Sequence, residues 1–279
     1  MADLKLFNKT ITNVKTQEYL ASVLGENKQA FVNNMTALVS NDKALQACEP
    51  MTLMFAGLKA TALGLPLDNN LGFAYVLPYR NNKENKTEAQ LQMGYKGIVQ
   101  LAIRSGQFET INVTDVREGE LKKRNRMTGE IETEWIEDDA IRSKLPIIGY
   151  IGYFKLLSGY SKTTYWSVEE LKQHGAKHSQ TFKKGYGVWK DNFDAMCKKT
   201  VLKLMLNKGD APMSVEMQQA IKYDQSVILD EQGNHRYADN EKPSAEDRLA
   251  AIADAESKIE EAEVVEVEYS DNGEISFEQ

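Results

Sequence analysis

The stretch Trp189 to Asn207, WKDNFDAMCKKTVLKLMLN, predicts a long helix with two different faces. Its apolar residues recur every three or four positions, which places them on one side of a helix. These apolar residues are Trp189, Phe193, Met196, Cys197, Val201 and Leu204. Lys198, Lys199 and Lys203 lie beside or opposite that side. A helix that buries one face and carries ammonium groups on another is suited to form one wall of a groove for a polyanion.

The first third of the chain predicts further helices. Residues 16–39 have apolar side chains at helical spacing, with an interruption near Gly25. Two more helical segments follow over residues 42–48 and 50–63, where Pro50 suits the first turn of a helix. We therefore expect a layer of helices at the N-terminus.

In the middle of the chain, apolar residues alternate with polar ones, which is the period of β-strands. The predicted strands are residues 73–79, 91–95 and 108–116, a hairpin over residues 120–136, and a second hairpin that joins 147–157 to 161–166. Three more helices are predicted over residues 97–105, 167–174 and 214–224. The expected fold class is α+β: N-terminal helices, a central antiparallel sheet with hairpins packed on the long helix, and an acidic C-terminal tail.

Charge is distributed unevenly along the chain. The net charge is −7, yet residues 1–223 contain 30 basic and 24 acidic residues, whereas residues 224–279 contain 4 basic and 17 acidic ones. Such asymmetry is typical of a basic body that binds an anion and of an acidic tail. We expect a folded part over residues 1–223 and a largely flexible tail over 224–279, in which residues 244–262 have the thin apolar face of a short partner-binding helix.

Several classes of protein are disfavoured by the sequence. No apolar run approaches the ~18 residues of a membrane span, and the first residues lack the apolar region of a secretory signal. Cys48 and Cys197 stand alone, so we expect reduced thiols and a cytoplasmic protein. No phosphate-binding loop occurs, and Gly185-Tyr186-Gly187 lacks the context of a dinucleotide site, so neither ATP use nor a cofactor is expected.

The most basic segment combines lysines with aromatic residues. Between Lys155 and Lys208 there are eleven lysines and only four acidic residues. Phosphates attract cations, and unpaired bases stack on flat side chains. Trp189 also fits the apolar face of its helix, so we expect it in the core. The candidate nucleic-acid-binding residues of this segment are Lys183, Lys184, Tyr186, Lys190, Lys198, Lys199 and Lys203.

Two further basic elements are candidates for the same surface. Tyr95 and Lys96 lie at the expected start of a short helix that leads to Arg104, and the glycines at 94 and 97 permit close approach of a backbone or a phosphate. A tight turn without a ligand and a salt bridge of Arg104 are the alternatives. The first arm of the hairpin over residues 120–136 adds Lys122, Lys123 and Arg124.

Other functions are weaker alternatives. A magnesium-dependent nuclease would use clustered carboxylates and a lysine, for which Asp115, Glu120 and Lys122 are candidates, but Glu120 is better explained as a solvated hairpin residue. Glu170 has the same spacing to Lys172, and Glu170, His174 and His178 could share a helical face with metal-ligand spacing. Glu170 is, however, well placed to complete a capping box with Ser167. A scaffold without catalytic activity and with an incidentally basic surface is the third alternative.

Three motifs in order resemble the RecT family of phage single-strand annealing proteins. The first runs from Gly64-Leu65 through LGFAYVLPY at residues 71–79, and the second from QMGYKG at 92–97 through Arg104-Ser105-Gly106. The third runs from Trp189-Lys190 through MCKKT at 196–200. Together they cover most of residues 30–210.

The resemblance implies a recombination protein and not a hydrolytic enzyme. Members of this family are expected to bind single-stranded DNA, to pair complementary strands without ATP or a cofactor, and to form rings or helical filaments. The resemblance further implies binding to the annealed duplex intermediate, to a phage exonuclease and to the host single-stranded DNA-binding protein. Residues 1–223 would then be the DNA-binding and annealing domain. Our own hypothesis from the basic residues is that Lys96 and Arg104 form the wall of a groove that faces the lysines of the long helix.

Overall fold

The computed structural model describes residues 2–125, 127–183, 185, 187–207 and 211–237. The folded unit includes the described residues 211–237, so it continues beyond the expected boundary at residue 223. The segment expected as a partner-binding helix, residues 244–262, lies outside the described residues. None of the described helices combines the length and the apolar composition that a membrane span requires.

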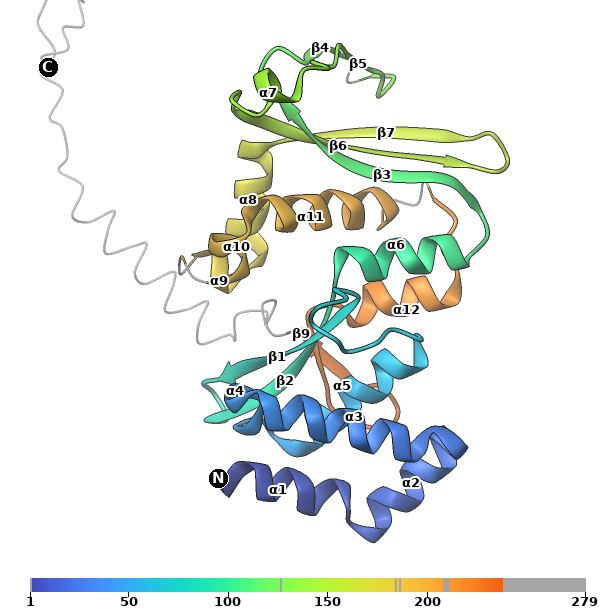
Figure 1. The fold of residues 1–279 in the computed structure, drawn as a ribbon, viewed down its shortest axis with the longest axis vertical. Helices are drawn as coiled ribbons and strands as arrows, with labels where there is room; N and C mark the ends of the chain where they lie inside the picture. The colour runs from blue at the N-terminus through green and yellow to red at the C-terminus, as the bar shows by residue number, and fades with distance from the viewer. Residues whose placement is uncertain (1, 126, 184, 186, 208–210, 238–279) are drawn as a thin grey trace, which may run out of the picture. The chain divides into compact units, whose positions relative to one another are not determined.

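The N-terminal part is helical, as the apolar spacing predicted (Figure 1). Its helices are α1 (Ala2–Ile11), α2 (Val14–Leu24), η1 (Gly25–Asn27), α3 (Lys28–Asn41), α4 (Lys43–Gln46) and α5 (Pro50–Ala62). Gly25 ends α2 with a positive φ of 55°, and Pro50 occupies the first turn of α5. Helix α1 was not predicted, although it buries Phe7 and Ile11.

The first sheet combines a hairpin with two strands from the end of the folded chain. β1 (Ala74–Asn81) pairs with β2 (Lys86–Met93), and the strand order is β1-β2-β8-β9. β8 (Ser226–Ile228) and β9 (His235–Tyr237) were not predicted, because three residues are too few to display a period of two. They place the segment after Asp224 inside the folded unit.

The predicted central sheet is divided in the structure. β3 (Phe108–Arg117), β6 (Ile147–Leu156) and β7 (Ser161–Ser167) form a separate antiparallel sheet. β4 (Leu121–Arg124) and β5 (Ile131–Thr133) form the predicted hairpin, and α7 (Asp139–Arg142) follows it. Helix α6 (Tyr95–Arg104) connects β2 to β3 and thus joins the two larger sheets.

The remaining helices follow β7. They are α8 (Val168–His178), α9 (Gln180–Lys183), α10 (Val188–Asp191), α11 (Phe193–Asn207) and α12 (Val215–Tyr223). The predicted capping box is confirmed: the backbone N–H of Glu170 donates to the Ser167 hydroxyl, and the Ser167 N–H donates to the Glu170 carboxylate. The predicted long helix is interrupted at Asn192, so Trp189 lies in α10 and the lysines lie in α11.

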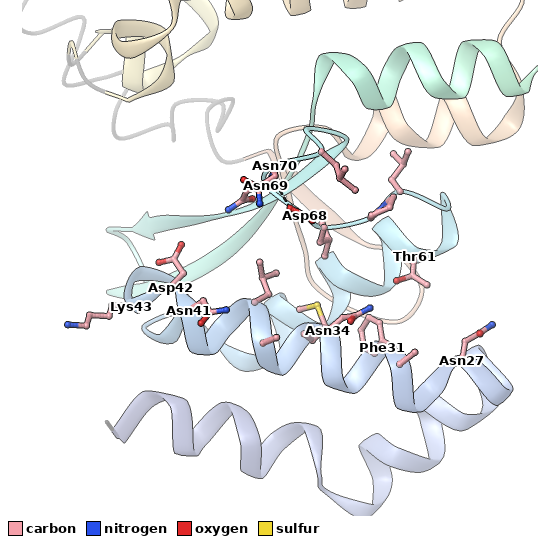
Figure 2. A pocket seen from close by; sticks show the side chains of 18 residues that line it. Asn27, Phe31, Asn34, Asn41, Asp42, Lys43, Thr61, Asp68, Asn69 and Asn70 are labelled. Atoms are coloured by element: carbon pink, nitrogen blue, oxygen red, sulfur yellow. Dashed lines mark hydrogen bonds between the residues drawn. The ribbon is translucent and has the colours of Figure 1, made fainter.

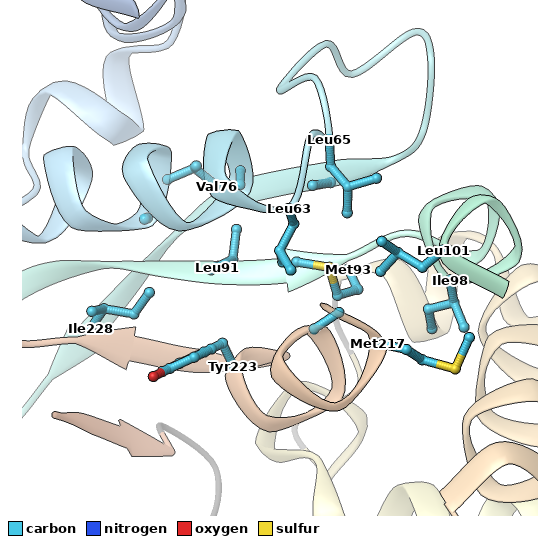
Figure 3. Close-up of a cluster of buried hydrophobic side chains, with 14 of the residues drawn as sticks. Leu63, Leu65, Val76, Leu91, Met93, Ile98, Leu101, Met217, Tyr223 and Ile228 are labelled. Atoms are coloured by element: carbon cyan, nitrogen blue, oxygen red, sulfur yellow. The ribbon is translucent and has the colours of Figure 1, made fainter. Parts of the chain in front are cut away.

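One buried cluster extends from Phe7 to Ile228. Figure 3 shows the part in which β1 and β2 meet α5, α6, α12 and β8, with Leu91, Met93 and Tyr223 among its side chains. Against the other sheet, α11 packs on β6, where a Cβ at Gly152 would lie 3.0 Å from the Met205 sulfur. Trp189 is buried between Phe182 and Phe193, which confirms its assignment to the core.

Candidate nucleic-acid interface

A cleft of about 480 Å³ lies between the β1–β2 hairpin, the start of α6 and the α10–α11 segment. We call it the α6–α11 cleft. Its lining includes two tyrosines and three lysines: Tyr75, Tyr95, Lys96, Lys198 and Lys199. Segments about one hundred residues apart in the sequence thus bring cations and flat side chains to one cleft. This combination matches the requirements of phosphates and of unpaired bases.

The α6 wall depends on two glycines. A Cβ at Gly94 would lie 2.0 Å from the Gly72 carbonyl oxygen, and one at Gly97 would lie 2.0 Å from that of Phe73. No side chain fits at either position, so glycine is required for the two backbone segments to cross this closely. This is the tight turn that was expected from the sequence as an alternative to a phosphate site. The Gly94 N–H donates to the Phe73 carbonyl at 2.8 Å. The close crossing places Tyr95 and the exposed Lys96 at the cleft.

The α11 wall carries two lysines in different states. The Lys198 ammonium is 2.8 Å from the Asp194 carboxylate and 4.0 Å from that of Asp115, with 30% of the side chain exposed. Lys199 is 6% exposed and binds Asp224 at 3.1 Å. The expectation that Lys199 lies on a free cationic surface is therefore wrong, because its ammonium is already paired inside the protein. Lys198 is the more accessible of the two lysines, and its ion pair with Asp194 lies at the cleft, where Asp194 also contributes to the lining.

Asp224 also binds the third predicted lysine of α11. Its carboxylate lies 2.7 Å from the Lys203 ammonium, and Lys203 lines an adjoining pocket of about 200 Å³ instead of the cleft. Burial alone would raise the pKa of Asp224, but Lys199, Lys203 and the Met93 N–H hold it below its usual value. Burial lowers the pKa of Lys199, and the Asp224 carboxylate opposes that shift.

Arg104 does not line the cleft. Its guanidinium donates to the Leu63 carbonyl at 2.7 Å, where it satisfies the C-terminal end of α5. Gly64 follows with a positive φ of 60°, and a Cβ there would lie 2.7 Å from the guanidinium. Arg104 therefore does not belong to the wall of this cleft, because it caps α5, while its contact with DNA stays a prediction.

The basic residues of the β4–β5 hairpin are also absent from the lining of the cleft. Lys122 pairs with Glu134 at 3.0 Å and Lys123 with Glu132 at 3.1 Å, both across the hairpin. Arg124 lies 3.7 Å from the Glu170 carboxylate and donates to the Tyr165 carbonyl. These pairs reduce the positive charge that the first arm suggested.

The other predicted contacts lie in the segment before α11. Lys183 and Lys190 are exposed and do not line the cleft, and Lys184 and Tyr186 lie outside the described residues. Tyr75 was not predicted as a site residue. Its alternating position in β1, within the first motif, was the signal that could have identified it.

The carboxylates proposed for a nuclease are occupied by arginines. Arg142 donates to Glu120 at 2.6 and 3.1 Å and lies 3.2 Å from Asp115, which Arg117 binds as well. Glu120 is fully buried, so the expectation of a solvated hairpin residue is wrong. Burial would raise the pKa of Glu120, but hydrogen bonds from Arg142 and from two backbone N–H groups keep it lower than usual. The arrangement resembles a structural ion cluster more than a magnesium site.

The candidate metal site of Glu170, His174 and His178 does not form either. Among the described residues, no group of three His, Cys, Asp or Glu side chains is placed to hold a metal ion. The His174 and His178 rings lie 4.5 Å apart, and Glu170 is engaged in the capping box. Burial, together with nearby positive charge, lowers the pKa of His174 to about 4.

A larger groove, of about 910 Å³, lies between α3 and the segment after α5 (Figure 2). Its lining includes five asparagines, two of which, Asn69 and Asn70, come from the segment after α5. Of the described residues that line it, Lys43 is the one basic residue, and Asp42 and Asp68 accompany it. This charge does not suit a polyanion, so the smaller cleft is the better candidate.

The protein has an α+β fold, and lysines and tyrosines line its α6–α11 cleft. Fold and site together are those expected of a nucleic-acid-binding protein. The chain belongs to the RecT family, whose sequence model matches residues 29–244. It is 37% identical over 239 residues to the uncharacterized protein YqaK of Bacillus subtilis (strain 168), covering 81% of this chain and 78% of that protein. Protein RecT of Escherichia coli (strain K12) is 27% identical over 223 residues, covering 78% and 80%. The resemblance is thus confirmed, and the chain is a DNA recombination and annealing protein.

Proposed function

We propose that this protein binds single-stranded DNA in the α6–α11 cleft and pairs it with a complementary strand without ATP. The observation that carries the proposal is the meeting of Lys96 and Tyr95 from α6 with Lys198 from α11 in one cleft. The basic balance of residues 1–223 and membership of the RecT family support the same conclusion.

The cleft would lower the barrier to pairing and leave the driving force to the DNA. Lysines neutralise phosphates, so two like-charged strands approach at lower cost. Tyr75 and Tyr95 offer faces on which bases can stack, worth about 1 to 3 kcal/mol per base. A strand held in an ordered path loses less entropy when its partner pairs, and base pairing then completes the reaction.

The wider setting of this function is part of the proposal. We infer that copies of the chain assemble into a ring or helical filament, which would extend the ordered path along the DNA. The partners would be a phage exonuclease that produces the single strand and the host single-stranded DNA-binding protein that covers it. This activity would take place in the cytoplasm.

Annealing can be separated from the alternatives in one assay. Labelled complementary oligonucleotides are incubated with the full chain, with and without Mg²⁺ and ATP. We expect faster pairing in all four conditions. Cleavage that depends on Mg²⁺ would instead indicate the nuclease, and unchanged pairing would indicate a scaffold.

The cleft is tested by neutralising its two accessible lysines. The variant Lys96→Gln/Lys198→Gln should bind a single-stranded oligonucleotide more weakly, with a salt-dependence slope smaller by roughly 0.7 per lost phosphate contact. Lys9→Gln/Lys15→Gln, on exposed positions of the N-terminal helices, is the matched control. Equal binding by both variants would refute the assignment of the cleft.

A further inference from the structure

Asp224 is a buried carboxylate with three partners on two other segments of the chain, the end of β2 and helix α11. It follows α12 directly and is 1% exposed. Oδ1 accepts a hydrogen bond from the Met93 N–H at 2.8 Å and lies 3.1 Å from the Lys199 ammonium, while Oδ2 lies 2.7 Å from that of Lys203. Charged hydrogen bonds of this kind hold their donors in a defined geometry.

These partners belong to the two sides of the α6–α11 cleft. Met93 is the last residue of β2 and immediately precedes Gly94, Tyr95 and Lys96 on the α6 wall. Lys199 follows Lys198 on the α11 wall, and both line the cleft. The carboxylate of Asp224 is therefore bound at once to the strand that leads into one wall and to the helix that forms the other.

The backbone after Asp224 holds the carboxylate in place. The Gln225 N–H donates to the Leu91 carbonyl at 2.8 Å, and Ser226 pairs with Leu91 in the sheet. Gln225 has a positive φ of 64°, which is uncommon for a residue other than glycine. Asp224 thus stands on a backbone paired with β2, so the α11 lysines are held at a fixed place relative to that strand.

We propose that Asp224 is a positioning residue for DNA annealing, which fixes the spacing between the Lys96 and Lys198 walls of the cleft. The inference rests on the proposed function of the cleft. Asp224 does not itself meet the DNA in this proposal. It binds Lys199 and Lys203 and thereby holds α11, which carries the accessible Lys198.

Neutralising Asp224 distinguishes a positioning role from a purely electrostatic effect of its carboxylate on DNA binding. Asp224→Asn removes one negative charge near the cleft and so raises the local net charge by one, which by electrostatics alone predicts tighter DNA binding. Positioning predicts the opposite, because two lysines lose the carboxylate that orients them. We expect Asp224→Asn to reduce affinity for a single-stranded oligonucleotide about tenfold and to lower the salt-dependence slope by roughly 0.7, the value for one phosphate contact.

Asp191→Asn is the matched control. Asp191 is exposed on α10, near the cleft but outside its lining, and its neutralisation changes the charge by the same amount. We expect this variant to bind the oligonucleotide as well as the unmodified protein or more tightly. If folded Asp224→Asn binds and anneals as Asp191→Asn does, the positioning role is refuted.

Two further variants keep the test decisive. Asp224→Glu retains the charge but displaces the carboxylate by one methylene, so we expect annealing slower than in the unmodified protein. If Asp224→Asn does not fold, as judged by circular dichroism, unchanged annealing by Asp224→Glu refutes the proposal. Lys96→Gln/Lys198→Gln tests the cleft separately: if it binds DNA normally, the proposed function fails, whatever Asp224 does.

Discussion

At the scale of single residues, the cluster of Asp115, Glu120 and Arg142 shows how a buried charge is retained. Glu120 accepts hydrogen bonds from Arg142, from the Arg117 N–H at 2.7 Å and from the Ile136 N–H at 3.3 Å. All of these favour the ionised carboxylate over the protonated one. Since Glu120 binds α7 and the residues that precede and follow the β4–β5 hairpin, the cluster stabilises the attachment of that hairpin.

Removal of the Glu120 charge should destabilise the protein in a pH-dependent manner. We expect Glu120→Gln to lose about 3 kcal/mol of unfolding free energy at pH 7, because Arg142 loses its fully buried partner and keeps its ion pair with Asp115. The folded-state pKa is below the unfolded value of 4.5, so this contribution is complete above pH 4.5 and is lost as the pH falls through the folded value. Denaturant unfolding between pH 3 and 7 measures the difference, with the exposed Glu118→Gln as control. A constant difference over that range would contradict the argument.

Gly97 should tolerate no side chain. In Gly97→Ala the new Cβ would meet the Phe73 carbonyl oxygen at 2.0 Å, so the start of α6 must move away from residues 72–73. We expect a loss of about 3 kcal/mol in unfolding free energy, together with weaker binding to single-stranded DNA. Thermal unfolding and oligonucleotide binding measure both effects. Gln100→Ala, on the same helix, should leave both nearly unchanged.

At the scale of elements, the capping box accounts for where α8 begins. Ser167→Ala should destabilise the protein by about 1 kcal/mol and lower its melting temperature by roughly 2 to 4 °C. The reason is that the Glu170 N–H loses its acceptor at the helix start. Ser158→Ala, in the turn between β6 and β7, is the control for loss of a serine hydroxyl. A melting temperature equal to that of the control would show that the cap contributes nothing.

The β4–β5 hairpin should contribute less to DNA binding than its sequence suggests. Lys122 and Lys123 are paired with Glu134 and Glu132 and, unlike the paired Lys198, do not line the α6–α11 cleft. We expect Lys122→Gln/Lys123→Gln to weaken binding to a single-stranded oligonucleotide about threefold or less, well below the effect of Lys96→Gln/Lys198→Gln. Fluorescence anisotropy at several salt concentrations compares the two. A larger effect of the hairpin variant would assign the main DNA contact to the hairpin.

At the scale of the whole molecule, the position of the C-terminal boundary decides which truncation is informative. Residues 226–228 pair with the sheet, and Asp224 is buried, so the folded unit extends past residue 223. Residues 241–279 contain 13 acidic and 3 basic residues. The division into an annealing domain and an acidic tail remains our proposal, with the tail beginning after Asn240.

Two truncations test this division. Removal of residues 241–279 changes the net charge from −7 to +3 and should leave thermal stability and annealing intact, with tighter DNA binding at low salt. Removal of residues 225–279 also deletes β8 and β9 and should lower the melting temperature, because β2 loses a partner strand. Loss of annealing in the shorter deletion would refute the division.

The sequence by itself determined the local features of this protein. Apolar spacing predicted most helices and the long strands, the Ser167–Glu170 spacing predicted a cap, and three motifs predicted the family. All of these depend on residues close together in the chain. Only the tertiary structure decided the roles of Lys199, Arg104 and Glu120, since each is set by a partner brought near through folding. Asp224 and Met93 are 131 positions apart, and the spacing of residue types along the chain cannot predict such a contact. The cleft was predictable in its residue types, but the fold decided which of its lysines remain accessible.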